Sequence, residues 1–183
     1  MLKSESALLI LVPEAEPLIG HLRARFDPSA ADGMPPHITL LYPFIPPEKV
    51  DSRVLNRLAA CFAPFEPIDY ALSEVRRFPA ATLYLKPEPD APFRALTMAI
   101  WQKFPETPPY GGLWPDIVPH LSIGQFENEA ELDRNAKEVA QEFAAKLPIR
   151  ANARSAVLMD TTPGQWTVRK TFDLKTRLSE DRR

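Results

Sequence analysis

A five-residue pattern occurs twice in this chain, and it narrows the possible folds more than any other feature. Residues 36–40 read Pro-His-Ile-Thr-Leu and residues 119–123 read Pro-His-Leu-Ser-Ile. Both copies have the order proline, histidine, aliphatic, hydroxyl, aliphatic. Because alternate residues of a β-strand share a face, each copy predicts a strand that displays an imidazole beside a hydroxyl and buries its aliphatic side chains.

The order of predicted elements around the two copies is also repeated. Hydrophobic periodicity and turn residues divide the chain into strand, helix, loop, histidine-bearing strand, helix and further strands, and the same order then begins again. The predicted strands cover residues 7–12, 37–42, 68–77, 80–86, 120–125, 149–159 and 165–174. The predicted helices cover residues 14–26, 52–63, 92–104 and 129–146, and the loops before the two histidines cover residues 27–36 and 105–118. Asp51, Asp90 and Asn128 are expected to cap the helices that follow them.

This repetition predicts one duplicated α+β domain over residues 1–183. The first lobe is expected at about residues 1–80 and the second at about residues 81–174, followed by a charged tail at residues 175–183. The alternative is that strands and helices alternate in a similar order without any duplication.

Charge and cysteine content exclude several classes of protein. A formal net charge of −2 disfavours a protein that coats long nucleic acids, although a local pocket for a nucleotide or an RNA end remains compatible with it. The single cysteine, Cys61, cannot form an internal disulfide or a multi-cysteine zinc site, and it fits a cytoplasmic protein. The apolar run at residues 7–12 is too short to span a membrane and is interpreted as a strand, not a signal peptide. We expect a monomer without a membrane partner.

The paired imidazoles and hydroxyls suit phosphodiester chemistry. Of two imidazoles that face a cleft, a neutral one can take a proton from water or a ribose hydroxyl, and a protonated one can give a proton to the leaving oxygen. The hydroxyls of Thr39 and Ser122 can donate hydrogen bonds to the phosphate oxygens on which negative charge develops. This chemistry needs no metal ion, so we expect neither a metal nor another cofactor.

The motifs His-Ile-Thr-Leu and His-Leu-Ser-Ile resemble the paired signature of the 2H phosphoesterases, the 2′-5′ RNA ligase-like or LigT-like superfamily. The resemblance extends over nearly the whole chain and implies two pseudo-symmetric lobes, with antiparallel sheets and outer helices, around a central cleft. It implies hydrolysis of a cyclic phosphodiester, notably a 2′,3′-cyclic phosphate of a nucleotide or RNA end, and in some members cleavage of 2′-5′ linkages or the reverse ligation. It implies that His37 and His120 are the acid/base pair and that Thr39 and Ser122 hold the phosphate. Some RNA-directed members place an arginine shortly after the second motif, where this chain reads Gly-Gln-Phe at residues 124–126.

Two other functions are compatible with the motifs. A binding module of the same fold could hold a nucleotide or RNA end without turnover, although such a module has no need of a proton-transfer pair. A metallohydrolase could use His37, His120 and a carboxylate, but the histidines are far apart in the chain and no His-x-x-x-His spacing is present.

Four further residues are candidates for substrate binding. Alternation in residues 80–86 places Tyr84 and Lys86 on one face, where they could line the cleft or simply form a solvated strand face. Tyr110 and Trp114 lie in the loop before His120, where an aromatic ring could stack on a base or anchor the loop to the core. The remaining histidine, His21, is predicted on the surface of the first helix.

Overall fold

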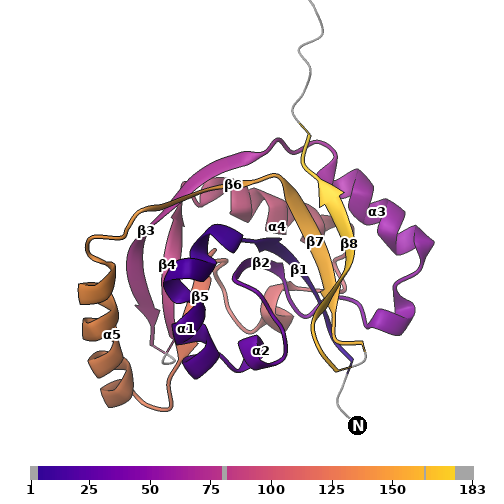
Figure 1. The fold of residues 1–183 in the computed structure, drawn as a ribbon. Helices are drawn as coiled ribbons and strands as arrows, with labels where there is room; N and C mark the ends of the chain where they lie inside the picture. The colour runs from indigo at the N-terminus through magenta and orange to yellow at the C-terminus, as the bar shows by residue number, and fades with distance from the viewer. Residues whose placement is uncertain (1–3, 80–81, 163, 176–183) are drawn as a thin grey trace, which may run out of the picture.

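The structure is a computed structural model that describes residues 4–79, 82–162 and 164–175 (Figure 1). The strands are β1 (Ser6–Leu11), β2 (His37–Leu41), β3 (Ile68–Phe78), β4 (Thr82–Glu88), β5 (Leu121–Gln125), β6 (Ile149–Ala153), β7 (Ser155–Asp160) and β8 (Thr167–Asp173). The α-helices are α1 (Glu16–Phe26), α2 (Pro28–Ala31), α3 (Ser52–Phe62), α4 (Ala91–Lys103) and α5 (Glu129–Phe143). Three short 3₁₀ turns, η1 (Pro13–Ala15), η2 (Pro47–Lys49) and η3 (Pro109–Gly112), complete the described elements.

The strands form two four-stranded sheets in which every neighbouring pair is antiparallel. One sheet has the order β2-β1-β7-β8 and the other has the order β5-β4-β3-β6. The two histidine-bearing strands, β2 and β5, therefore occupy corresponding edges of the two sheets. The predicted α+β class with antiparallel sheets is confirmed.

Each sheet combines strands from both halves of the sequence, so the sheets do not follow the lobe boundary predicted near residue 80. β3, which belongs to the first half, pairs with β4, and β7 and β8 return from the C-terminal half to pair alongside β1. β3 and β4 pair in antiparallel orientation from Ala71 with Glu88 to Phe78 with Thr82. Periodicity predicts that a strand exists, but it carries no information on which strand it pairs with.

The long strand predicted at residues 149–159 is two strands that lie in different sheets. β6 pairs with β3 through partners such as Ile149 and Leu72, whereas β7 pairs with β1 through partners such as Leu158 and Leu8. The chain passes from one sheet to the other at Arg154, between the two strands. The prediction was wrong here because residues before and after Arg154 are equally β-prone, and only their different pairing partners separate them.

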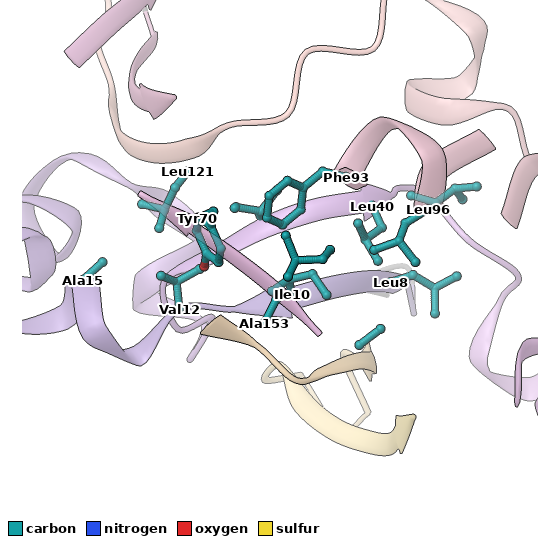
Figure 2. Packing of buried hydrophobic residues seen from close by; sticks show 14 of the residues in the cluster. Leu8, Ile10, Val12, Ala15, Leu40, Tyr70, Phe93, Leu96, Leu121 and Ala153 are labelled. Atoms are coloured by element: carbon teal, nitrogen blue, oxygen red, sulfur yellow. The ribbon is translucent and has the colours of Figure 1, made fainter. Parts of the chain in front are cut away.

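The inner faces of both sheets contribute to one hydrophobic core (Figure 2). Ile10 and Leu40 of the first sheet belong to the same buried cluster as Tyr70 and Leu121 of the second. The ring of Tyr70 meets the ring of Phe93 from α4 edge to face, with the ring centroids 5.0 Å apart. This shared core sets the relative position of the two histidine-bearing strands.

The helices and the two histidine strands pack crosswise. α1, which precedes β2 in the chain, contacts β5, and α4, which precedes β5, contacts β2 (Figure 1). The contact between α1 and β5 is close at Gly124, where an added Cβ would lie 2.6 Å from the Cβ of Phe26. Only glycine allows the helix to approach the strand to this distance.

Two of the three predicted N-terminal helix caps are present in the structure. The carboxylate of Asp51 accepts a hydrogen bond from the Val54 N–H, and the side chain of Asn128 accepts one from the Glu131 N–H. Asp90 makes no such cap and instead accepts a hydrogen bond from the guanidinium of Arg94. The short helix α2, inside a predicted loop, begins after Asp27, which caps it. Within the described ranges, no helix has the length and apolar character that crossing a membrane requires.

Candidate active site

The first histidine, His37, begins β2, and the second, His120, directly precedes β5; these two strands contact each other where the two sheets meet (Figure 1). His37 and Thr39 are half-buried, whereas the intervening Ile38 is buried in the core. His120 and Ser122 are half-buried in the same way, on either side of a buried leucine. This alternation places the imidazole and the hydroxyl of each copy on the same face of its strand.

The two imidazoles are oriented by matching hydrogen bonds. His37 Nδ1 lies 2.8 Å from the carbonyl oxygen of Pro35, and His120 Nδ1 lies 2.7 Å from the carbonyl oxygen of Val118. Because a carbonyl oxygen only accepts, each Nδ1 carries the hydrogen and donates it. In both neutral imidazoles Nε2 is therefore the atom that can accept a proton, and in both protonated imidazoles it is the atom that can give one.

Burial shifts the titration of both histidines toward the neutral form. It lowers the pKa of His37 to about 4, against the opposing effect of the hydrogen bond to Pro35, and the positive charge of Arg23 lowers it further. A proton on His120 also lowers the pKa of His37, so the two imidazoles lie close enough to influence each other. Burial lowers the pKa of His120 as well, while the hydrogen bond to Val118 acts in the opposite direction. Negative charge on a bound phosphate would favour protonation again.

Three aromatic rings surround His120. The rings of Phe78 and Tyr84 meet its imidazole at steep angles, 84° and 65°, with centroid distances of 4.9 and 5.5 Å. The ring of Tyr110 is nearly parallel to the imidazole at a centroid distance of 6.5 Å. Phe78 and Tyr84 stack on each other at 4.3 Å. Tyr84 reaches this position because it lies opposite Ser122 in the pairing of β4 with β5.

A buried ion pair lies at the C-terminal end of α1. Arg23 is only 2% exposed, and its Nε and Nη2 lie 3.0 and 2.9 Å from Oδ2 of Asp27, one helical turn later. The other carboxylate oxygen of Asp27 accepts hydrogen bonds from the backbone N–H and the hydroxyl of Ser29. The charges of Arg23 and Asp27 also act on the pKa of His37, in opposite directions: Arg23 lowers it and Asp27 raises it.

Sequence reasoning missed Phe78 and the Arg23–Asp27 pair. Phe78 could have been found from the predicted hairpin. Tyr84 of β4 lies opposite Arg76 of β3, so Phe78, two residues after Arg76, is the diagonal neighbour of Tyr84. Arg23 and Asp27 have the i, i+4 spacing that usually marks an ion pair on an exposed helical surface. Only the packing of α1 against the second sheet shows that this pair is buried.

The other candidate residues have varied surroundings. Lys86 is half-buried, with its ammonium 3.4 Å from a carboxylate oxygen of Glu88 on the same strand. Trp114 is 62% exposed and lines an open groove of about 320 Å³ between α4 and the following loop. Tyr110 lines the same groove and thereby connects it with His120. His21 is exposed, as its position on the first helix predicts.

The loop that carries Tyr110 is anchored to the first histidine-bearing strand. The backbone N–H of Tyr110 donates a 2.7 Å hydrogen bond to the carbonyl oxygen of Tyr42, just after β2. Tyr110 has a φ of 53°, a left-handed conformation that is uncommon for an aromatic residue. The loop therefore joins the end of β2 to the ring that lies over His120. In the part of the chain that the structure describes, no three His, Cys, Asp or Glu side chains gather in a way that could hold a metal ion.

A family model described as the 2′-5′ RNA ligase superfamily matches residues 11–165, which include both histidine strands. The chain belongs to the 2′-5′ RNA ligase superfamily. The predicted resemblance to the 2H phosphoesterases is thus confirmed by a match over most of the chain.

Relatives with curated names agree with membership of the superfamily. A protein of Bacillus cereus strain G9842, whose name describes it as an inferred phosphoesterase, is 30% identical over 161 residues, which cover 84% of this chain and 86% of the relative. A Bacillus anthracis protein with the same description is 30% identical over 157 residues, with the same coverage. Phosphoesterase chemistry is therefore the activity to which the superfamily and these relatives point.

Solved structures of two other bacterial proteins have the same fold. Escherichia coli LigT in complex with 3′-AMP matches 95% of this chain and 99% of its own, with a TM-score of 0.61 and 15% identity. A Thermus thermophilus protein, TT0787, matches 95% of this chain and its full length, also with a TM-score of 0.61 and 15% identity. LigT has further been crystallised in complex with NADP⁺. At this identity the likeness concerns the fold alone.

Proposed function

We propose that this protein is a phosphodiesterase that hydrolyses a cyclic phosphodiester by acid/base catalysis between His37 and His120. The observation that carries the proposal is the matched orientation of the two imidazoles, each of which donates its Nδ1 hydrogen to a carbonyl oxygen two residues earlier. Both Nε2 atoms are thereby available for proton transfer, and the imidazoles need no metal ion to perform it.

The reaction uses both Nε2 atoms in one displacement. One neutral imidazole takes a proton from water as the water oxygen forms a bond to phosphorus. The bond between phosphorus and one ribose oxygen breaks, and the electron pair that leaves with this oxygen accepts a proton from the other, protonated imidazole. The product is a phosphate monoester. The two histidines have exchanged their protonation states and return to the starting form through solvent.

Thr39 and Ser122 are proposed to hold the phosphate during this step. Each lies two residues after a histidine on the same strand face, half-buried, with a hydroxyl that can donate to a non-bridging oxygen. A hydrogen bond from such a donor to a charged oxygen contributes about 1.5–3 kcal/mol.

The proposed substrate is a 2′,3′-cyclic phosphate on a nucleotide or at an RNA end. The net charge of −2 disfavours binding along a long nucleic acid, which favours a small ligand or a terminus. Tyr84, Tyr110 and Trp114 are proposed as the residues nearest a base, and Lys86 as a charge that attracts phosphate.

The decisive experiment is an assay with 2′,3′-cyclic nucleotides and with short RNA bearing a cyclic end, in excess EDTA. We expect monophosphate to form at the same rate with and without EDTA. Loss of activity in EDTA would contradict the two-histidine mechanism. Tight binding of the nucleotides without any turnover would instead support a binding module of the same fold.

A further inference from the structure

The second sheet carries two cations on the face that displays its motif hydroxyl, Ser122. We propose that Arg76 and Lys86 form a second phosphate-binding subsite, which takes a phosphate on the 5′ oxygen of the nucleotide whose 2′,3′-cyclic phosphate is hydrolysed. The preferred substrate then carries phosphate at both ends of the ribose. This inference rests on the proposed function, because it names the substrate class of the same reaction.

A row of side chains across three neighbouring strands leads from the motif hydroxyl to Arg76. Ser122 of β5 lies opposite Tyr84 of β4, and Tyr84 lies opposite Arg76 of β3. Directly opposite residues of antiparallel strands share a face of the sheet. Arg76 therefore lies on the face of Ser122, two strand spacings away, which is roughly 10 Å between the backbones. Its long side chain shortens this distance toward a phosphate at the other end of the ribose.

Lys86 lies on the same face, because it follows Tyr84 by two residues on β4. The side chains of Lys86 and Arg76 are 25% and 46% exposed, so both charges are accessible to a ligand. The ring of Tyr84 contacts His120, with the ring centroids 5.5 Å apart. The two cations thus lie just beyond a residue that contacts the second histidine.

Each cation has a carboxylate partner that lies farther along the sheet from the histidine. Arg76 Nη2 is 2.8 Å from a carboxylate oxygen of Glu74, and Lys86 Nζ is 3.4 Å from one of Glu88. Glu74 lies opposite Lys86, one diagonal step from Tyr84, and Glu88 follows Tyr84 by four residues. Exposed ion pairs of this kind contribute little to stability, so a phosphate can displace the carboxylates at small cost.

The corresponding row of the first sheet is apolar beyond its hydroxyl. Thr39 of β2 lies opposite Leu9 of β1, and Leu9 lies opposite Val157 of β7. Leu9 and Val157 are both buried in a small apolar cluster. Of these two rows, only the one in the second sheet offers a cation, so a ligand with a second phosphate has a preferred orientation in the site.

The first test compares nucleoside 2′,3′-cyclic phosphates with and without a phosphate on the 5′ oxygen. The intact protein should hydrolyse the 5′-phosphorylated form with a kcat/KM at least about tenfold higher, chiefly through a lower KM, because hydrogen bonds between charged groups are the strong ones. Arg76→Met should bring the two values within about twofold of each other. Lys86→Met should reduce the preference by less, because an ammonium contacts phosphate as a point charge.

Arg77→Met is the matched control. Arg77 is the next residue of β3 and is 53% exposed, but it lies opposite the buried Leu83 and its guanidinium pairs with Asp133 of α5. This variant should keep the full preference, and Glu74→Gln should strengthen it, because Arg76 then loses the carboxylate that competes with phosphate. An unchanged preference in Arg76→Met, or an equal loss in Glu74→Gln, would overturn the proposal.

A dinucleotide that ends in a 2′,3′-cyclic phosphate distinguishes two sources of the second phosphate. In the dinucleotide the group on the 5′ oxygen is a diester with one negative charge, whereas a terminal 5′-phosphate carries up to two. A higher kcat/KM for the dinucleotide would assign the subsite to an RNA end, and a higher value for the 5′-phosphorylated mononucleotide would assign it to a free nucleotide. In both cases Arg76→Met should lose the preference.

A binding measurement separates failure of the subsite from failure of the proposed function. By isothermal titration calorimetry, adenosine 3′,5′-bisphosphate should bind the intact protein about tenfold more tightly than adenosine 3′-monophosphate, and Arg76→Met should abolish the difference. If this difference is present but no cyclic substrate is hydrolysed, the proposed function fails and the subsite stands. If hydrolysis proceeds with no preference in either measurement, the subsite is wrong and the proposed function stands.

Discussion

The surroundings of β2 and β5 differ far more than their sequences do. Both strands present a histidine and a hydroxyl on one face, and both imidazoles donate Nδ1–H to the carbonyl two residues earlier. The charges of a buried ion pair, Arg23 with Asp27, act on the pKa of His37, whereas three aromatic rings lie close to His120. The repeated pattern thus provides two equivalent reacting atoms, and the tertiary neighbours make them unequal.

The largest expected effect tests the equivalence of the two strands. His37→Ala and His120→Ala should each reduce kcat/KM for a 2′,3′-cyclic nucleotide by about 10²- to 10⁴-fold, because each removes one proton-transfer group. His21→Ala, in which an exposed histidine is changed, should retain full activity. Steady-state assays of the three purified variants, with circular dichroism as a check of folding, provide the comparison. Near-normal activity in either strand variant would show that only one histidine takes part.

A second expectation concerns stability and tests the burial of His37. Its pKa of about 4 in the folded protein lies below the ordinary value of 6.5, so between these values the unfolded chain binds more protons. The free energy of unfolding should therefore fall as the pH is lowered from 6.5 towards 4, by up to about 3 kcal/mol from this residue. Urea denaturation at several pH values should show a flatter dependence for His37→Gln. His21→Gln should have the slope of the intact protein, and the same slope in all three proteins would contradict the burial of His37.

Removal of the hydroxyl from either strand is expected to lower kcat/KM by less than removal of a histidine. Thr39→Val and Ser122→Ala each remove one donor to the phosphate while keeping the side-chain volume nearly constant. A hydrogen bond to a charged group contributes about 1.5–3 kcal/mol, so kcat/KM should fall by roughly 10- to 150-fold in each variant. Thr39→Ser and Ser122→Thr keep the hydroxyl and should recover most of the activity. If Thr39→Val were fully active, the phosphate would be held by the second strand alone.

The smallest expected effect concerns a position at which the two strands differ in sequence. Gly124 follows the second pattern where Leu41 follows the first. Gly124→Ala would place a Cβ 2.6 Å from that of Phe26, and the enforced shift of α1 should cost about 1–3 kcal/mol of unfolding free energy. Gly20→Ala is the control, because its new methyl group meets only the movable carboxylate of Glu16. Thermal unfolding that leaves Gly124→Ala as stable as the control would show that the approach of α1 is not this close.

The local features of the fold could be predicted from the sequence because they depend on near neighbours in the chain. The strand at His37–Leu41 and the helix starts after Asp51 and Asn128 lie where alternation and capping chemistry place them. The placement of His37 with Thr39, and of His120 with Ser122, on one strand face follows from the same alternation. These properties are decided by backbone geometry over a few residues.

The features that depend on pairing and packing could not be predicted in this way. The split of residues 149–159 between two sheets depends on which strands lie alongside as partners, not on the residues themselves. The Arg23–Asp27 pair is buried only because α1 packs against β5 of the other sheet. The sequence by itself determined which side chains can react. The tertiary structure decided which charges and rings surround them, because the field at an imidazole comes from groups that are near in space, whatever their distance along the chain.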